Sequence, residues 1–358
     1  MADAGPVRRA TVRDIAAATG VSIATVSRVL NDHANVAPAT RELVQRTVER
    51  LGAQGGASEP EAPGAIYLRC PYTLTDYFGL IVSSIAESLE PHQRTLILDA
   101  GENSQAATVL PTLAGRSGVA GAIMILPPEP DEQLVALRAQ GFPFVVVDPR
   151  GEVPRDIAAV SAAHLTGARS ATHHLLAAGH RRIGVIAGPE EWLASRDRLA
   201  GHTSALADAG ILPDRALVRA VEPTVRLGHW AAGELLDLPE PPTAVVCFND
   251  KTAIGAMAAA AERGLRVPRD LSVTGFDDID LAQAANPMLT TVRQPLAEMG
   301  RMAVSLLIRL IDRQPVDALH VELATELVVR GSTGAVRGRF TVRLVCGLTG
   351  VFYGFALV

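Results

Sequence analysis

Residues 11–31 read TVRDIAAATGVSIATVSRVLN and predict two short helices joined by a tight turn. Thr11 can cap the first helix, with Asp14 three residues further on as its capping-box partner. Gly20 ends that helix, because glycine readily takes the left-handed conformation that a helix C-terminus needs. Ser22 can cap the second helix. The stretch therefore predicts a helix-turn-helix.

A third helix is expected between Pro38 and Gly52. Proline is favoured in the first turn of a helix, and glycine is favoured just beyond the last turn. Between them, apolar side chains recur at helical spacing: Leu43, Val44, Val48 and Leu51. Residues 1–52 thus form a small all-α headpiece.

The second helix has two distinct faces when successive residues are stepped by about 100°. One face carries apolar residues that can pack on the first helix: Val26, Val29 and Leu30. The other face carries residues that can enter a DNA groove: Ile23, Ala24, Ser27 and Arg28. A helical hairpin that merely packs, with Arg28 in solvent, is the alternative. Because the cap, turn, apolar face and arginine agree, DNA binding is favoured.

Each residue type on this face predicts a kind of DNA contact. Arg28 can bond O6 and N7 of a guanine together, and Ile23 and Ala24 can contact thymine methyl groups. Polar residues in and around the motif suit phosphates and positioning. The predicted DNA-contacting set is completed by Thr11, Ser22, Thr25, Ser27, Asn31, Thr40 and Arg41.

Residues 11–52 closely resemble the headpiece of the lactose-repressor/galactose-repressor (LacI) family. They match its pattern T-x-x-D-[IV]-A, G-V-S-x-x-T-V-S-R-V-L-N, V-x-x-x-T-R and L-G almost completely. The resemblance implies a repressor that binds double-stranded DNA as a homodimer, with one recognition helix in each half of a palindromic operator.

Residues 53–64 form a linker rich in glycine, alanine and proline, without periodicity. The LacI family usually continues L-G-Y-x-P-N and then A-R-x-L, a hinge helix that inserts a leucine into the minor groove. This chain has Gly55 and Gly56 there, followed by Glu59 and Glu61, which would repel phosphates. We expect a poorly helical hinge that contributes little to minor-groove binding.

From residue 65 onward, short apolar runs alternate with amphipathic segments. Near-continuous apolar runs separated by helical patterns are typical of buried parallel strands with crossover helices. The runs are 65–69, 94–98, 121–125, 144–148, 182–186, 243–248 and 272–276. The sequence predicts an α/β domain over 65–334, composed of two doubly wound subdomains. The resemblance to the LacI family implies that this is the effector and dimerisation domain.

This body also resembles the periplasmic-binding-protein-like part of the LacI family, in strings such as GHRRIGVI (179–186) and FNDKTAIGAM (248–257). The resemblance implies a sugar or sugar derivative as effector, and chain crossovers between subdomains near 160, 290 and 322. It carries over five polar contacts by motif position: Asp148, Arg150, Arg198, Asn249 and Asp277.

Aromatic residues can lie against the apolar face of a sugar. Tyr77 and Phe78 are candidates for this role, with packing in the core as the alternative. Trp192 or Trp230 can supply a further ring. Asp250 and Asp278 also follow strands, and for them helix capping is at least as well supported as ligand contact.

No pattern for a metal, a cofactor or catalysis stands out. His173, His174 and His180 are close in sequence, but no cysteine or carboxylate completes a metal site, and structural roles are favoured. A phosphate-binding loop, a nucleophile elbow and a pair of catalytic carboxylates are all absent from the sequence. We therefore expect no enzyme activity and no cofactor.

Composition agrees with a regulator in a reducing cytoplasm. The chain has 358 residues, 48% of them hydrophobic and 20% charged, and three cysteines in no ligand spacing. Its net charge is −5, yet residues 1–54 hold seven arginines against five acids. No secretory signal opens the sequence. The uncharged stretch 344–358 is shorter than the ~20 residues of a membrane span, so no membrane contact is expected.

Two other interpretations remain open at this stage. A solute-binding protein of the same α/β fold would bind the sugar without DNA, although the headpiece argues against it. A degraded regulator with weakened DNA binding would explain the unusual linker and the atypical apolar tail over 335–358.

Overall fold

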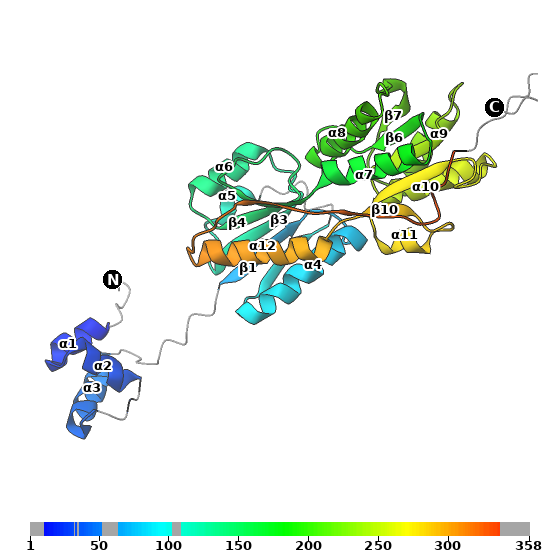
Figure 1. The fold of residues 1–358 in the computed structure, drawn as a ribbon. Coiled ribbons are helices and arrows are strands. Elements are labelled where there is room, and N and C mark those ends of the chain that lie inside the picture. The colour runs from blue at the N-terminus through cyan, green and yellow to red at the C-terminus, as the bar shows by residue number, and fades with distance from the viewer. Residues whose placement is uncertain (1–10, 32, 34–35, 52–63, 102–108, 337–358) are drawn as a thin grey trace, which may run out of the picture. The chain divides into compact units, whose positions relative to one another are not determined.

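The computed structural model describes residues 11–31, 33, 36–51, 64–101 and 109–336. The chain divides into two compact units, Met1–Gly64 and Ala65–Val358 (Figure 1). The predictions for the linker fall almost wholly outside the described residues, as do those for the apolar tail beyond residue 336.

The first unit is the predicted all-α headpiece, with helices α1 (Val12–Thr19), α2 (Ile23–Leu30) and α3 (Pro38–Leu51). The Thr11 and Asp14 side chains form the predicted capping box, and the Ser22 hydroxyl accepts a hydrogen bond from the Thr25 amide. Gly20 ends α1 with φ 70°, which glycine adopts without strain. A small core joins the three helices: Ile15, Val26, Val29 and Val44.

The second unit contains two six-stranded sheets. The first, sheet A, has the order β11-β5-β4-β3-β1-β2, with every neighbouring pair parallel. Its strands are β1 (Ala65–Cys70), β2 (Leu96–Ala100), β3 (Val119–Ile125), β4 (Phe144–Val147), β5 (Ala158–Ala162) and β11 (His320–Leu323).

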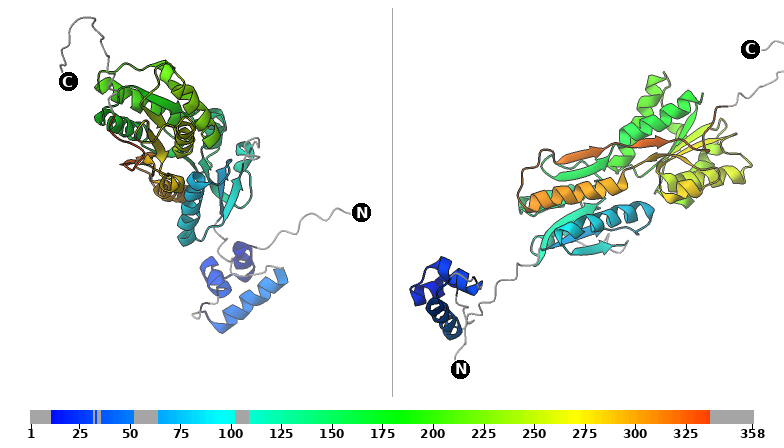
Figure 2. Two further views of the ribbon diagram at one scale, coloured as in Figure 1. Left: turned by 90° about the vertical axis from the view of Figure 1, so that its right-hand side faces the viewer. Right: turned by 60° about the horizontal axis from the view of Figure 1, so that its bottom comes forward.

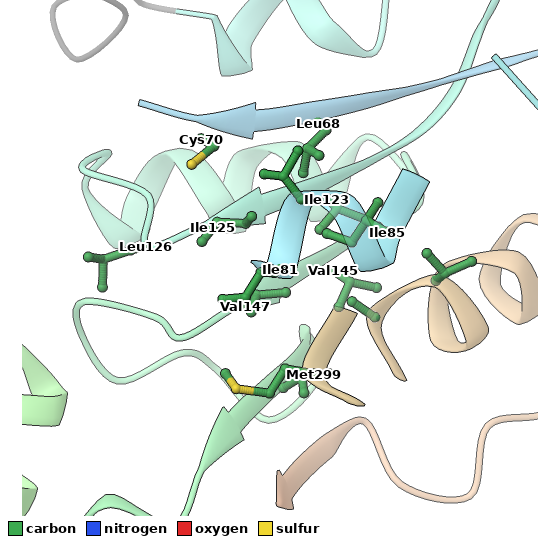
Figure 3. Packing of buried hydrophobic residues seen from close by; sticks show 14 of the residues in the cluster. Leu68, Cys70, Ile81, Ile85, Ile123, Ile125, Leu126, Val145, Val147 and Met299 are labelled. Carbon is green, nitrogen blue, oxygen red and sulfur yellow. The ribbon is translucent and has the colours of Figure 1, made fainter. Parts of the chain in front are cut away.

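Helices cover both faces of sheet A. On one face lie α4 (Asp76–Leu89) and α12 (Leu296–Ile311), which run side by side in both Figures 1 and 2. Their apolar side chains, among them Ile81, Ile85 and Met299, pack on Ile123 and Val145 of the sheet (Figure 3). The opposite face packs against the short helices α5 (Leu110–Leu113) and α6 (Asp131–Ala139).

The second sheet, sheet B, has the order β12-β10-β9-β8-β6-β7 and is parallel except for the edge pair β10–β12. Its strands are β6 (Ile183–Ala187), β7 (Val218–Ala220), β8 (Ala244–Cys247), β9 (Ser272–Asp277), β10 (Thr290–Arg293) and β12 (Glu326–Val328). Its flanking helices are α7 (His164–Ala177), α8 (Leu193–Asp208), α9 (Val225–Leu236), α10 (Asp250–Glu262) and α11 (Asp280–Ala284).

The second unit has two halves, one built on sheet A and the other on sheet B. The chain passes between these halves three times. It leaves sheet A after β5 and enters α7, returns from β10 to α12, and moves from β11 in sheet A to β12 in sheet B. The predicted fold class, a helix-turn-helix headpiece with two doubly wound subdomains, is confirmed. Among the described helices, none is long and apolar enough to cross a membrane.

Close helix packing in the second half depends on glycines. A Cβ atom added at Gly201 in α8 would lie 2.2 Å from the Leu165 carbonyl oxygen in α7. The same distance separates a Cβ at Gly255 in α10 from the Val225 carbonyl oxygen in α9. Since backbone atoms cannot yield as side chains do, a larger residue at either position forces the helices apart.

We therefore expect Gly201→Ala to lower the free energy of unfolding by about 1–3 kcal/mol, measured by urea denaturation. Gly79→Ala in α4 is the matched control, because its Cβ would meet nothing closer than the Leu74 carbonyl oxygen at 3.9 Å. That control should be neutral or stabilising by about 0.5–1 kcal/mol. Equal stability changes in the two variants would contradict this account of the packing.

Candidate functional site

The face of α2 that the sequence predicts to enter a DNA groove is exposed to solvent. Ile23, Ala24 and Arg28 are exposed, whereas Val26 and Val29 are buried in the headpiece core. Ile23 is 51% exposed and takes no part in the headpiece core. The side chains that sequence reasoning assigned to bases thus lie on the free face of the helix.

The other predicted DNA-contacting residues serve local structure in the free headpiece. The hydroxyl of Thr11 bonds Asp14, and that of Ser22 bonds Thr25. Asn31 donates to Ser27 at 3.4 Å. Arg41 donates to the His33 carbonyl at 2.6 Å and thereby ties α3 to the preceding loop. Thr40 lies half-buried in the first turn of α3.

The second unit contains a cavity of about 410 Å³ between the ends of the two sheets. Sheet A contributes residues that follow β1, β3 and β4, and sheet B contributes residues at the ends of β6, β7, β8 and β9. All seven predicted effector residues line this cavity: Tyr77, Phe78, Asp148, Arg150, Arg198, Asn249 and Asp277.

Aromatic rings from both halves line the cavity. The rings of Tyr72 and Phe78 stack with centroids 4.5 Å apart, and Tyr77 meets Phe78 edge-on at 5.0 Å. Trp192 and Phe248 face them from the other half, with centroids 6.1 Å apart. Such rings give apolar surface of the kind that packs against the C–H face of a sugar.

Arg150 connects the two aromatic groups. Its guanidinium lies 5.6 Å from the centroid of the Tyr72 ring and 5.3 Å from that of Trp192. Its Nε donates to the Tyr72 hydroxyl at 3.0 Å. The Leu193 amide also donates to the Arg150 carbonyl at 2.6 Å. Arg150 therefore joins the two halves beside the cavity.

Asp148 and Arg198 occupy the buried polar side of the cavity. Tyr77 donates to one carboxylate oxygen of Asp148, and the ring of His164 bonds the other at 2.9 Å. Burial by itself raises the pKa of Asp148, but His164, Tyr77 and Arg198 outweigh it and lower that pKa. Burial and Asp148 hold the pKa of Tyr77 well above its usual value. The phenol therefore stays protonated and donates a hydrogen bond to Asp148.

Arg198 is held on several sides. Its Nη1 donates to the Phe248 carbonyl at 2.5 Å, and its guanidinium lies 3.7 Å from the Phe276 ring centroid. Asp277 lies 3.9 Å away. Because burial of an unpaired guanidinium is costly, these contacts fix Arg198 before any ligand arrives.

Asn249 combines a structural role with a free donor. Its Oδ1 caps α10 by accepting from the Thr252 amide at 3.0 Å. Among the described residues, none accepts a hydrogen bond from its Nδ2, which remains for a ligand. Asp250 and Asp278, for which helix capping was the alternative to ligand contact, neither cap a helix nor line the cavity, since the N-cap residues of α10 and α11 are Asn249 and Ile279. Asp250 accepts hydrogen bonds from the Ile279 amide and the Thr291 hydroxyl, and Asp278 pairs with Arg293 and Arg330.

Sequence reasoning missed several residues of the site. Tyr72, Thr75, Glu222 and Lys251 line the cavity, and Lys251 donates to Thr75 at 2.9 Å. Tyr72 could have been found from the sequence, since it lies three residues beyond the first apolar run, 65–69. Of the two tryptophans proposed as a ring platform, Trp192 lines the cavity, whereas Trp230 is 53% exposed on α9.

The clustered histidines bond other side chains. His173 bonds Asp208, His174 bonds Thr333, and His180 bonds Thr243 and Ser272. Within the described residues, no group of three or more histidine, cysteine, aspartate or glutamate side chains is arranged to hold a metal ion.

Comparison with known proteins matches each of the two units to a family of known proteins. The profile "Bacterial regulatory proteins, lacI family" matches residues 11–52, and "Periplasmic binding protein-like domain" matches 172–333. The HTH-type transcriptional repressor CytR of Escherichia coli is 34% identical over 336 residues, 91% of this chain and 97% of CytR. The chain belongs to the lacI family of bacterial regulatory proteins.

Further relatives agree with this assignment. The HTH-type transcriptional regulator MalR of Streptomyces coelicolor is 35% identical over 91% of this chain and 97% of its own. A CelR–cellobiose complex has a TM-score of 0.68 at 32% identity, covering 90% of this chain and all of that one. The lac repressor dimer bound to operator and the anti-inducer ONPF also scores 0.68, at 30% identity over 92% and 100% of the two chains. This lacI-family protein is a transcription regulator rather than an enzyme.

Among the carboxyls that line the cavity of this lacI-family regulator, that of Asp277 has a strongly raised pKa. Burial raises the pKa of Asp277 to about 6, although Arg198 and a hydrogen bond from Gln294 at 2.7 Å oppose the shift. Because the folded-state pKa exceeds the ordinary 3.8, ionising Asp277 costs more in the folded chain. Its contribution to stability is full below about pH 4 and is lost as the pH rises through 6.

We expect Asp277→Asn to reduce this fall in the free energy of unfolding between pH 4 and 6, measured by urea denaturation. A difference of about two between the folded-state and unfolded-state pKa values changes the free energy of unfolding by roughly 3 kcal/mol. Asp237→Asn is the control, because bonds from Arg263 lower the pKa of that exposed carboxyl. If the free energy of unfolding of the Asp277 variant fell with pH as steeply as that of wild type, the carboxyl would not titrate as described.

Proposed function

We propose that this lacI-family regulator is a repressor that binds a palindromic operator as a homodimer and responds to an uncharged sugar in the cleft. The observation that carries the proposal is the meeting of aromatic rings and paired polar groups from both sheets in one cavity of about 410 Å³. Ligand sites of open α/β folds lie at the carboxyl ends of strands, as this cavity does.

The relatives support each part of this function. CytR is named a repressor, and the lac repressor is a dimer on its operator. A CelR structure holds cellobiose, and a LacI-family regulator from Enterococcus faecium holds ribose. The exposed face of α2, with Arg28 among apolar neighbours, suits the major groove.

The charges of the cavity favour an uncharged ligand. Four carboxylates line it, Asp148, Glu191, Glu222 and Asp277, against three cations. Two of the cations, Arg150 and Arg198, are already held by rings and hydrogen bonds. A phosphorylated sugar or a sugar acid would have to approach this excess of carboxylates, whereas hydroxyl groups can donate to them.

Effector control follows from the way the chain crosses between the halves. Three crossovers connect them, so a ligand that bonds both sheets biases their closure or rotation. In a dimer, that movement changes the spacing at which the headpieces meet the two half-sites.

DNA footprinting upstream of its own gene and of neighbouring genes tests the operator. We expect wild-type protein to protect a palindromic site and Arg28→Ala to lose that protection, because loss of a bidentate guanine contact costs about 1–3 kcal/mol per half-site. Arg46→Ala is the control, since Arg46 lies on α3 in a surface pair with Glu42 and carries the same charge. Equal losses in both variants would exclude the assigned role of Arg28.

Trp192 offers a test of the effector. In Trp230→Phe it is the single tryptophan, so a change in its fluorescence on adding D-glucose, D-ribose or cellobiose reports binding in the cleft. Asn249→Ser keeps a helix cap but removes the amide donor, and it should weaken binding by about tenfold. A response to glucose 6-phosphate alone would contradict the uncharged class.

A further inference from the structure

His164 is a buried histidine at the junction of the two halves. It begins α7 directly after the chain leaves β5, and its side chain is 4% exposed. It does not line the cavity, but it contacts two residues that do, Asp148 and Arg198. These come from different halves, since Asp148 follows β4 of sheet A and Arg198 lies on α8 beside sheet B.

The contacts of His164 fix which ring nitrogen carries the proton. Arg198 approaches Nδ1 with Nη2 at 3.2 Å and Nε at 3.4 Å. A guanidinium only donates hydrogen bonds, so Nδ1 must accept. The hydrogen is therefore on Nε2, which donates to the Asp148 carboxylate at 2.9 Å. The ring is a neutral bridge between a buried cation and a buried anion.

This bridge keeps Asp148 and Arg198 from pairing directly. A guanidinium and a carboxylate at this depth attract strongly, and direct contact would use polar atoms that a ligand could otherwise bind. The other contacts of Asp148 and Arg198 are compatible with the bridged arrangement: Asp148 accepts from Tyr77, and Arg198 contacts the Phe248 carbonyl, the Phe276 ring and Asp277. Asp148 also holds a left-handed backbone conformation, φ 51°, that directs its side chain.

We propose that His164 is a positioning residue of the effector site, a neutral imidazole that holds Asp148 and Arg198 apart and presents both to the ligand. The proposal rests on the proposed function for the identity of the occupant, whereas the bridge itself exists without one. It also makes His164 part of the connection between the halves, because each of its partners belongs to a different sheet.

Other buried histidines show what a purely structural role looks like. His180 is 2% exposed and bonds Thr243, Ser272 and the Gly334 carbonyl, all beside sheet B. His202 bonds Thr172 between α7 and α8. Neither contacts a cavity-lining residue through these bonds. His180→Ala is therefore a matched control for the loss of a buried imidazole.

The first test needs no ligand. In ¹⁵N NMR spectra of full-length protein, assigned with His164→Asn and Arg198→Lys, we expect the His164 ring protonated at Nε2 alone at neutral pH. We also expect a slowly exchanging Arg198 Nε–H signal. That signal should disappear in His164→Ala, return in His164→Asn and persist in His180→Ala. Asparagine can restore the bridge because one side chain both donates and accepts.

The second test uses the Trp192 signal with D-ribose and cellobiose. We expect His164→Ala to weaken sugar binding by about tenfold or more, because Asp148 and Arg198 each lose a partner, and His164→Asn to bind within about threefold of wild type. His180→Ala should lower thermal stability without changing affinity.

A doubly protonated His164 ring, an unchanged Arg198 signal in His164→Ala, or equal sugar affinity in His164→Ala and His164→Asn would overturn the proposal. If neither sugar binds wild-type protein, the sugar part of the proposed function fails, and the ring-nitrogen and guanidinium signals still decide whether the bridge exists.

Discussion

The carboxyl ends of the parallel strands of both sheets open into the same cavity, and the burial of charge there constrains the rest of the second unit. Parallel strands place their terminal polar residues at one edge, so two facing sheets bring Asp148, Asp277 and Asn249 together, and α8 adds Arg198 from beside sheet B. Taken out of water, each needs a partner before a ligand binds. The partners come from helices and crossovers: Tyr77 from α4, His164 from the start of α7, and Gln294 from the segment before α12.

The same arrangement confines movement to a few places. Within each half, strands pair along their length and helices pack closely, as at Gly201 and Gly255, where backbone nearly touches backbone. Interiors packed in this way do not deform gradually. Relative motion is therefore left to the three crossovers and to the contacts that span the cleft, such as Lys251 with Thr75 and the Leu193 amide with the Arg150 carbonyl. In the proposed function, an effector acts by adding to these contacts.

How much of the structure the sequence predicts depends on whether the residues that determine each feature are close together along the chain. The capping box at Thr11 and the turn at Gly20 involve neighbours, so α1 and α2 follow from the residues themselves. The sequence predicts the strands that are rich in valine and isoleucine. It does not predict β5 (AAVSA) and β10 (TTVR), which lack a long apolar run although both are mostly buried. The role of His164 was out of reach, because its partners lie 16 and 34 residues away and meet it only when both sheets have formed.

The small number of base-reading groups on α2 favours the use of two headpieces. The reading face of α2 offers one group able to form a bidentate base contact, Arg28, beside the apolar Ile23 and Ala24. Such a contact discriminates by about 1–3 kcal/mol, whereas specific operators are separated from non-specific DNA by about 4–10 kcal/mol. The linker adds Glu59 and Glu61 rather than basic or wedge residues. Two copies of α2 on a palindrome double the discrimination to about 2–6 kcal/mol, which overlaps this range and supports the proposed dimer.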